Sequence, residues 1–259
     1  PLLVVLIQIV VRLFSGMAQN SCDAKQDSPF NLIVFPQPDS SGVVAVTDFI
    51  NTDIVYSGYI QGIFFWFNED EGEAVVWRSP DPRFVLLPEN IHVSSRLKRF
   101  IRHSPYKYTF DKDFDGVIER CRTVKRPGQD GTWIGPSMIK TYKQLHRLGI
   151  AHSVEVWHED ALVGGFYGVL IGQVFFGESM FSLMSNTATS ALGIFFDVFF
   201  SCGGRMIDSQ VYTDNIARFG GKNISRTAFL RLEKDMLFSP LSEEVKDAFE
   251  KHPAVCKKL

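Results

Sequence analysis

The feature that most constrains the fold is a run of two-residue periodicity between residues 152 and 181. This run contains HSVEVW, LVGGFYGVL and QVFFGESMF, which alternate in polarity or stay apolar and are separated by the short turns HEDA and IG. Strands joined by so few residues pair antiparallel, because a parallel connection needs a much longer crossover. The spacing therefore predicts an antiparallel meander.

Helical periodicity surrounds this meander. A phenylalanine-rich helix over about residues 187–201 is expected to end at Cys202-Gly203-Gly204, and a buried strand, RMIDSQV, follows it. The order of helices, meander, helix and strand indicates an α+β domain with a mainly antiparallel sheet. The other expected helices lie over about residues 47–60, from Ser94 or Ser95, from near Asp115, over 136–148 before Gly149, and from about Thr227 to Asp235 as the last helix.

The chain divides into four expected segments. Residues 1–30 are an N-terminal extension, 31–84 a small α/β domain, 85–246 the main domain and 247–259 a C-terminal tail. The opening PLLVVLIQIVVRLF is too short to span a membrane and lacks the basic start of a secretion signal. Two interpretations of it stay open, namely a packing segment or a stretch that precedes a natural start at Met17.

Composition excludes several classes of protein. With 45% hydrophobic and 22% charged residues, the chain is globular rather than fibrous or disordered. A net charge of -2 leaves only a local basic surface as a means of binding nucleic acid. The 23 phenylalanines favour an aromatic core or an aromatic pocket.

Metal binding is not expected from the motifs. The four cysteines are scattered without zinc-ligand spacing, which predicts free thiols and a cytoplasmic protein. DKDFDG begins like a calcium loop, but Arg122 occupies the twelfth position, where calcium requires a glutamate. Asp113 and Asp115 are better explained as acids at the N-terminus of a helix.

Polar residues on otherwise apolar strands point to a site. Simple alternation places Asp208 and Gln210 on one face of RMIDSQV, and Glu178 lies within the apolar FFGESMF. A buried carboxylate costs several kcal/mol unless it is paired or hydrogen-bonded. Two interpretations follow from the residues alone: a structural network, or a polar cluster beside an aromatic pocket that holds an amine or moves a proton.

A basic helix is the second candidate surface. In VSSRLKRFIRH, Leu97, Phe100 and Ile101 form the apolar face. The remaining positions carry the cations Arg96, Lys98, Arg99 and Arg102. These cations suit either an ordinary solvated helix face or contacts with a phosphate backbone.

Seven segments of the chain occur in the order and spacing of one known family. GIFFWF, SPDPR, GTWI, HSVEVW, LVGGFYGV, FGESMFS and MIDSQV resemble the leucyl/phenylalanyl-tRNA protein transferases, from about Phe35 to Leu237. The resemblance implies an enzyme that moves leucine or phenylalanine, with methionine as a further candidate, from aminoacyl-tRNA to an N-terminal lysine or arginine. The modified protein is thereby marked for degradation. It also implies an acetyltransferase-like (GNAT) main domain.

The same resemblance implies roles for individual residues. An aminoacyl ester is already activated, so no cofactor or metal is expected, and positioning dominates the chemistry. Asp208 and Gln210, with Glu178 nearby, are implied beside the reacting amine and ester. The cations of the basic helix are implied at the tRNA acceptor stem. The implied pocket for the amino-acid side chain and terminal adenine consists of Trp66, Trp133, Phe166, Phe175, Met180, Phe195 and Ile207.

Four positions depart from the family pattern, and one expected pocket residue conflicts with simple strand alternation. The family usually has proline at Phe65, tryptophan at Arg78, histidine near Asn215 and proline at Ser225. Arg78 is the most consequential, because a cation replaces an aromatic residue expected near the pocket entrance. Simple alternation also places Ile207 on the face opposite to Asp208.

Two rival functions remain. The first is a GNAT-like acyltransferase with a different acyl donor, although the pyrophosphate loop of coenzyme A enzymes is absent from the sequence. The second is a non-catalytic tRNA- or degron-binding protein, against which the buried polar groups argue.

Overall fold

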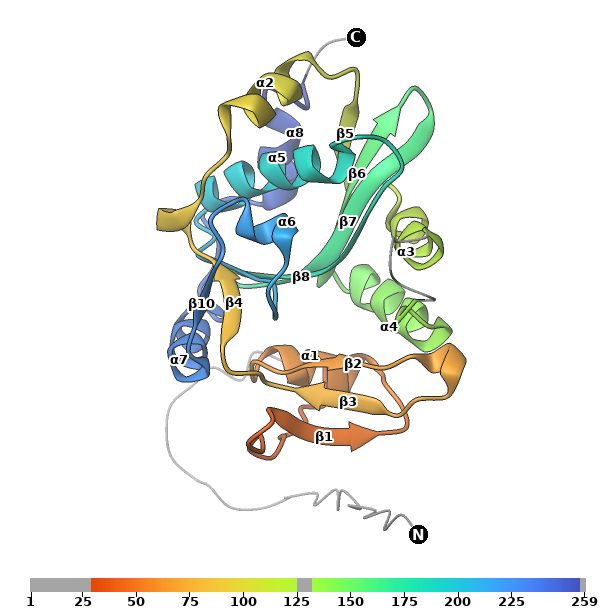
Figure 1. Ribbon diagram of the computed structural model, residues 1–259, viewed down its shortest axis with the longest axis vertical. Helices are drawn as coiled ribbons and strands as arrows, with labels where there is room; N and C mark the ends of the chain where they lie inside the picture. Colours follow the sequence, from red (N-terminus) through yellow and green to blue (C-terminus); the bar gives the residue numbers. More distant parts are fainter. Residues whose placement is uncertain (1–28, 125–131, 257–259) are drawn as a thin grey trace.

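The computed structural model describes residues 29–124 and 132–256 (Figure 1). The N-terminal apolar run, Met17 and Cys22 lie outside the described residues, so the predictions made for them stay predictions. No helix in the described ranges combines the length and the apolar character needed to cross a membrane.

A seven-stranded sheet forms the centre of the molecule, in the order β10-β4-β9-β8-β7-β6-β5. Neighbouring strands are antiparallel except for the parallel pair β8 and β9. The predicted α+β class, mainly antiparallel sheet and meander are therefore confirmed. The strands are β4 (Arg83–Leu86), β5 (Lys107–Phe110), β6 (Ala151–His158), β7 (Ala161–Ile171), β8 (Val174–Ser182), β9 (Met206–Asp208) and β10 (Lys222–Ile224).

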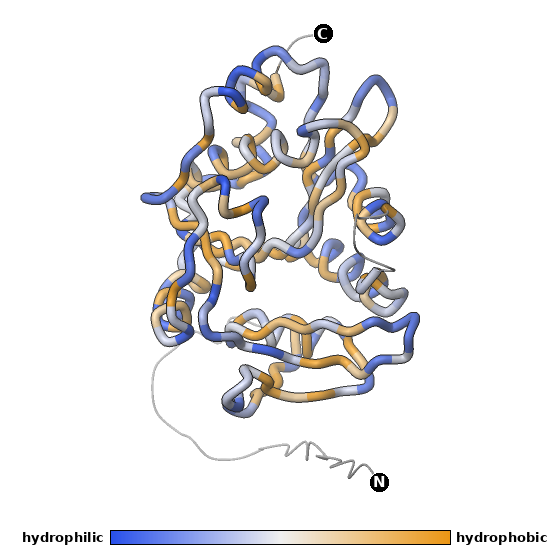
Figure 2. Tube along the Cα trace, viewed as in Figure 1, coloured by the Kyte–Doolittle hydropathy of each residue, from blue (hydrophilic) through white to orange (hydrophobic). Residues whose placement is uncertain are grey.

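Helices cover both faces of this sheet, with α3 and α4 on one face and α5, α8 and α2 on the other (Figure 1). The two faces bury separate apolar clusters. Figure 2 shows that the turn between β6 and β7 is hydrophilic and lies at the end of the hairpin, away from these apolar clusters. The helices are α2 (Ser95–His103), α3 (Phe114–Thr123), α4 (Pro136–Arg147), α5 (Thr187–Ser201), α6 (Asp214–Ala217), α7 (Arg226–Met236) and α8 (Val245–Lys251), with a short 3-10 helix at Pro88–Asn90.

Local signals in the sequence account for several helix ends. The Ser94 hydroxyl accepts a hydrogen bond from the Leu97 amide and caps α2, as predicted. Asp113 caps α3 by accepting from the Gly116 amide, which confirms its role at a helix N-terminus. Gly149, with a φ of 71°, follows the last turn of α4, where a left-handed residue is needed.

A smaller sheet packs below the large one (Figure 1). Its strands are β1 (Val43–Thr47), β2 (Phe64–Trp66) and β3 (Val75–Arg78), in the order β1-β3-β2. Helix α1 (Thr52–Tyr59) packs against α4 and so joins this sheet to the main one. The acidic NEDEGE run connects β2 to β3, as expected of a turn, and contains a 3-10 helix at Glu69–Glu71.

Two expectations about the elements need correction. The helix from about Thr227 is not the last one, because α8 follows it and its Phe249 is fully buried, with its ring 5.7 Å from that of Phe110. The expected C-terminal tail therefore begins inside a packed helix. The RMIDSQV strand ends at Asp208, because Gln210 adopts a left-handed backbone with a φ of 58°. The four segment boundaries themselves stay a prediction.

Candidate active site

An aromatic hollow of about 230 Å³ opens where β8 and β9 separate. Their parallel pairing runs as far as Phe176 and Asp208, after which the turn at Ser209 leads the chain away from β8. Residues Gly177 to Met180 then face Ser209 across the gap, and α5 and α6 close the other sides. We call this cavity the aromatic hollow. Its apolar wall comprises Trp133, Phe166, Phe175, Met180, Leu192, Phe196 and Ile207.

A β-bulge places Glu178 at the hollow. Tyr167 pairs with Ser179 and Gly168 pairs with Gly177, so Glu178 is the extra residue on β8. A bulge re-aims the side chain of the extra residue and is frequent beside active sites. The bulge therefore explains how a carboxylate on an apolar strand lies on the cavity wall.

Two tyrosines hold the Glu178 carboxyl. The Tyr59 hydroxyl donates to Oε1 at 2.7 Å and the Tyr142 hydroxyl donates to Oε2 at 2.9 Å. The two hydroxyl oxygens also lie 2.5 Å apart, and the Gln210 amide Nε2 donates to Oε1 at 3.3 Å. Burial raises the pKa of Glu178 to about 7, and the tyrosine hydrogen bonds limit that rise.

Proton counting around this ring agrees with a raised pKa. Three close contacts join Tyr59, Tyr142 and Glu178, and each needs one proton between its two oxygens. The two hydroxyls supply two protons, and a protonated carboxyl supplies the third. Ionised Glu178 leaves one contact without a proton, which is unfavourable in a buried network. The close contact between the two hydroxyls therefore favours the protonated carboxyl, whereas the hydrogen bonds from the tyrosines to Glu178 favour the ionised one.

Asp208 also lines the hollow, and its carboxylate is held in a buried ion pair. Its Oδ1 accepts from Arg83 Nε at 2.8 Å and its Oδ2 from Arg83 Nη2 at 2.5 Å. Both side chains are at most 1% exposed, and the guanidinium lies between the rings of Phe64 and Phe229. This bidentate geometry satisfies both oxygens of the carboxylate. Asp208 is therefore oriented away from solvent by the fold.

Asp208 also fixes the position of Gln210. Its Oδ1 accepts a hydrogen bond from the Gln210 backbone amide at 2.9 Å, and the Gln210 carbonyl accepts from the Phe84 amide at 3.2 Å. These bonds hold the left-handed backbone that a glutamine adopts only at a cost. The predicted proximity of Asp208, Gln210 and Glu178 is thus found in the structure. A turn produces it, and not the strand alternation used to predict it.

The turn also explains how Ile207 can line the pocket although it lies on the face of β9 opposite to Asp208. Ile207 packs into the apolar cluster under α5 and lines the hollow, whereas the Asp208 carboxylate points to the opposite side, toward Arg83. The two residues keep the opposite faces that alternation predicts. Ile207 reaches the cavity because the hollow opens at the end of β9 and on its α5 side.

The residues expected in the pocket separate into three groups. Trp133, Phe166, Phe175, Met180 and Ile207 line the hollow. Phe195 lies behind this wall, 1% exposed, with its ring 4.5 Å from that of Phe175. Trp66 lies on β2 of the small sheet, is 40% exposed and packs edge-on against Phe64, outside the lining of this hollow.

Arg83, Tyr59 and Tyr142 are the functional candidates that sequence reasoning missed. Arg83 stands at the end of SPDPR, so the quoted segment contained it without assigning it a role. Tyr59 and Tyr142 come from α1 and α4, and their pKa values are well above the usual range because of burial and the nearby Glu178 charge. No local pattern distinguishes them from core tyrosines, because their partner lies on β8.

The departures from the family pattern fall in different places. Asn215 lines the hollow, where its Nδ2 lies 3.3 Å from the sulfur of Met180. Ser225 caps α7 by accepting from the Ala228 amide. Phe65 packs against Trp77 within the small sheet. Arg78 pairs with Phe64 at the end of β3, outside the lining of the hollow.

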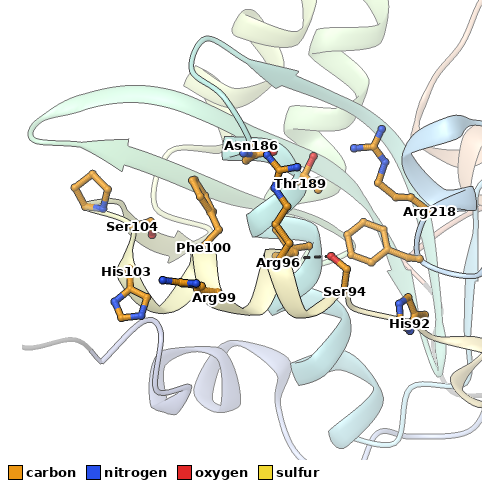
Figure 3. Close-up of a pocket in the computed structure, with 13 residues that line it drawn as sticks. His92, Ser94, Arg96, Arg99, Phe100, His103, Ser104, Asn186, Thr189 and Arg218 are labelled. Atoms are coloured by element: carbon orange, nitrogen blue, oxygen red, sulfur yellow. Dashed lines mark hydrogen bonds between the residues drawn. The ribbon is translucent and has the colours of Figure 1, made fainter.

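A second cavity, of about 850 Å³, lies against α2 (Figure 3). We call it the basic hollow, and its cationic or titratable lining is His92, Arg96, Arg99, His103 and Arg218. Figure 3 shows Arg96 reaching from α2 toward Asn186 and Thr189, with Arg218 on another side of the cavity. Of the four cations predicted on α2, Arg96 and Arg99 line this hollow, while Lys98 and Arg102 are exposed outside its lining.

Comparison with known proteins gives one family. The family model described as leucyl/phenylalanyl-tRNA protein transferase matches residues 85–234. Proteins named leucyl/phenylalanyl-tRNA--protein transferase from Yersinia pestis (strain Pestoides F) and Yersinia pseudotuberculosis serotype O:1b (strain IP 31758) are each 44% identical over 216 residues. Each match covers 82% of this chain and 89% of the relative.

Two solved structures are distantly similar to this chain. A GCN5-related N-acetyltransferase from Kribbella flavida has a TM-score of 0.34 at 9% identity, over 66% of this chain and 59% of that one. A functionally unknown conserved protein from Staphylococcus epidermidis ATCC 12228 has a TM-score of 0.36 at 12% identity, over 71% and 68%. Likenesses at this level carry no argument about the site.

Proposed function

Because this chain belongs to the leucyl/phenylalanyl-tRNA protein transferase family, we propose that its aromatic hollow is where an aminoacyl ester meets a protein amine. The chain is a transferase that moves an aminoacyl group from tRNA to protein. The observation that carries the proposed location is the meeting of an apolar wall with the Glu178 carboxyl in one cavity, where Gln210 donates a hydrogen bond to that carboxyl. The apolar wall receives the side chain of leucine or phenylalanine, with methionine as a further donor.

The reaction needs positioning and one proton transfer. The acceptor nitrogen attacks the ester carbonyl, a C–N bond forms, and the bond from the carbonyl carbon to the ribose oxygen breaks. The amine proton must reach that departing oxygen. Glu178 is the group in the hollow with a pKa near 7, so it accepts the proton from the amine and delivers it to the leaving oxygen.

Gln210 and Asp208 have different parts in this scheme. The Gln210 Nε2 donates to Glu178, and its carboxamide oxygen, which accepts no hydrogen bond from residues 29–124 or 132–256, orients the acceptor amine. Asp208 acts as a positioning residue, because both of its oxygens are occupied by Arg83 and one also holds the Gln210 amide. Arg83 is the partner that satisfies both oxygens of the buried Asp208 side chain.

We assign the finer acceptor and donor interactions as follows. The acceptor is a protein with an N-terminal lysine or arginine, and the extension creates a signal for degradation. The cations Arg96, Lys98, Arg99 and Arg102 bind the tRNA acceptor stem, and no carboxylate within the described ranges pairs with any of the four. The cytoplasm is the compartment in which aminoacyl-tRNA is available, and the free thiols of Cys202 and Cys256 suit it.

A transfer assay tests the proposal. The protein is incubated with Leu-, Phe- or Met-tRNA and with peptides that differ only in beginning with arginine, lysine or alanine. We expect one added residue on the arginine and lysine peptides and none on the alanine peptide. Transfer that ignores the first residue would refute the acceptor assignment. Full transfer by Gln210→Ala would refute the location of the site.

A further inference from the structure

The aromatic hollow and the basic hollow share two walls. Along α5, Asn186 and Thr189 line the basic hollow, whereas Leu192 and Phe196 line the aromatic one. Thr189, Leu192 and Phe196 follow one another at three- and four-residue spacing along α5 and so lie on one side of the helix, and Asn186 precedes the helix as its N-cap. Thr189 and Leu192 are about 4.5 Å apart along the helix axis. The two cavities therefore adjoin along α5.

Helix α6 and its flanks separate the same two cavities. Thr213, Asn215 and Ile216 line the aromatic hollow, whereas Arg218 and Phe219 line the basic hollow. A ligand anchored in the aromatic hollow must pass this short partition to reach the cations beyond it. Arg218 is the cation on the partition itself, only three residues along the chain from Asn215 of the aromatic hollow.

The basic hollow lacks the charges that would neutralise it. No aspartate or glutamate is among its lining residues, which include three arginines and two histidines. The Arg218 Nε donates only to the Asp214 backbone carbonyl at 3.3 Å, and no described carboxylate pairs with Arg96, Arg99 or Arg218. Guanidinium groups without internal partners suit phosphate, which they bind through two parallel hydrogen bonds.

We propose that the basic hollow binds the phosphodiester backbone of the single-stranded 3′ end of the donor RNA, with Arg218 on the phosphates closest to the esterified ribose. This proposal rests on the proposed function, in which the aromatic hollow contains the aminoacyl ester. The strand then runs from α6 toward α2, where Arg96 and Arg99 bind the phosphates at its junction with the acceptor stem. Arg218 is therefore a positioning residue, because it fixes the strand whose end carries the reactive ester.

Donors with and without phosphates test this assignment. The three donors are Phe-tRNA, a 3′-phenylalanylated CCA trinucleotide, and 3′-phenylalanyl-adenosine, which has no phosphate. For Arg218→Ala, we expect kcat/KM with the trinucleotide and with tRNA to fall by about 10- to 100-fold relative to kcat/KM with the adenosine donor. Arg218→Lys should recover part of this loss, because it keeps the charge but not the planar fork.

The matched control is Arg231→Ala, which removes an exposed cation on α7 outside both hollows. This variant should leave kcat/KM unchanged with each of the three donors. Equal losses with all three donors would overturn the proposal, because Arg218 would then support the α6 turn only. A loss with tRNA but not with the trinucleotide would overturn it too, because the phosphate contacts would then lie in the duplex stem. Wild-type protein inactive with every donor would refute the proposed function instead.

Discussion

The aromatic hollow and the basic hollow differ in how completely the chain satisfies its own polar groups. Glu178 and Asp208 are held by Tyr59, Tyr142 and Arg83 before any substrate is present. The cations lining the basic hollow face no carboxylate among the residues that the structure describes. The polar groups of the first region are therefore held in place by the fold, whereas the cations of the second are left available for a polyanion.

This difference predicts opposite costs of mutation. A change in the aromatic hollow leaves a buried partner without its counterpart, so both folding and catalysis should suffer. A change in the basic hollow removes an exposed charge, so binding of RNA should weaken while the fold remains intact. The predictions below test this contrast.

The largest effect is expected from Asp208→Ala. The substitution leaves the fully buried Arg83 guanidinium unpaired and releases the Gln210 backbone, so it should cost about 3–5 kcal/mol of stability and abolish transfer. Urea unfolding and the transfer assay measure the two losses. The double variant Arg83→Met/Asp208→Leu removes both charges and should regain most of the stability without regaining transfer. Recovery of transfer by the double variant would contradict a positioning role for Asp208.

A smaller loss of transfer, with a defined dependence on pH, is expected from Glu178→Gln. Transfer should fall about 100-fold, because the proton acceptor is lost. The pKa of Glu178 is about 7, so the ratio of wild-type to variant kcat/KM should rise as the pH increases through 7 and then level off. Dividing the two profiles removes the titration of the acceptor amine, which is common to both. A ratio independent of pH would exclude Glu178 as the titrating group.

The same substitution makes a prediction about stability. The unfolded state loses the Glu178 proton near the ordinary pKa of 4.5, whereas the folded state keeps it to about 7. Wild-type stability should therefore decline relative to that of Glu178→Gln as the pH rises from about 4.5 to about 7. Urea unfolding at pH 4.5, 6 and 7.5 measures this trend, and an opposite trend would mean that the tyrosines stabilise the charged carboxylate more than burial opposes it.

Charge reversal on α2 tests the other region. Lys98→Glu/Arg99→Glu should weaken RNA binding by on the order of tenfold at low salt and reduce the salt slope by about 0.7 to 0.9 for each lost phosphate contact. Both residues are exposed, so the melting temperature should not change. Titration of labelled tRNA over a range of salt concentrations measures the slope. Arg231→Glu/Lys234→Glu on α7 is the matched control, and unchanged binding by the α2 variant would remove α2 from the interface.

The smallest effect is expected from Tyr59→Phe. The Tyr59 hydroxyl lowers the pKa of Glu178, so its removal should raise that pKa and move the rise in kcat/KM to higher pH. Loss of one hydrogen bond should slow transfer at pH 7 by about threefold. Tyr56→Phe on the same helix is the control, because that ring stacks on Phe30 away from Glu178. A shift to lower pH would contradict the assigned direction of the hydrogen bond.

Much of the architecture was predictable because it depends on local signals. The meander follows from alternating strands joined by short turns, and α5 follows from an apolar run that ends before Gly203. Helix α8 was missed because its apolar contacts, through Phe249, are made to distant residues of α5 and β5. Five of the seven expected pocket residues line the aromatic hollow, and the family resemblance supplied that selection.

The sequence by itself determined the α+β class, the sites of the main helices and strands, and the unusual presence of Glu178 and Asp208 on apolar strands, since these depend on periodicity and residue type. Only the tertiary structure decided what these acids contact. Their partners Tyr59, Tyr142 and Arg83 are remote in the chain, and the β8 bulge and the left-handed Gln210 set their directions. A pKa depends on burial and on neighbours in space, and neither is encoded in spacing along the sequence.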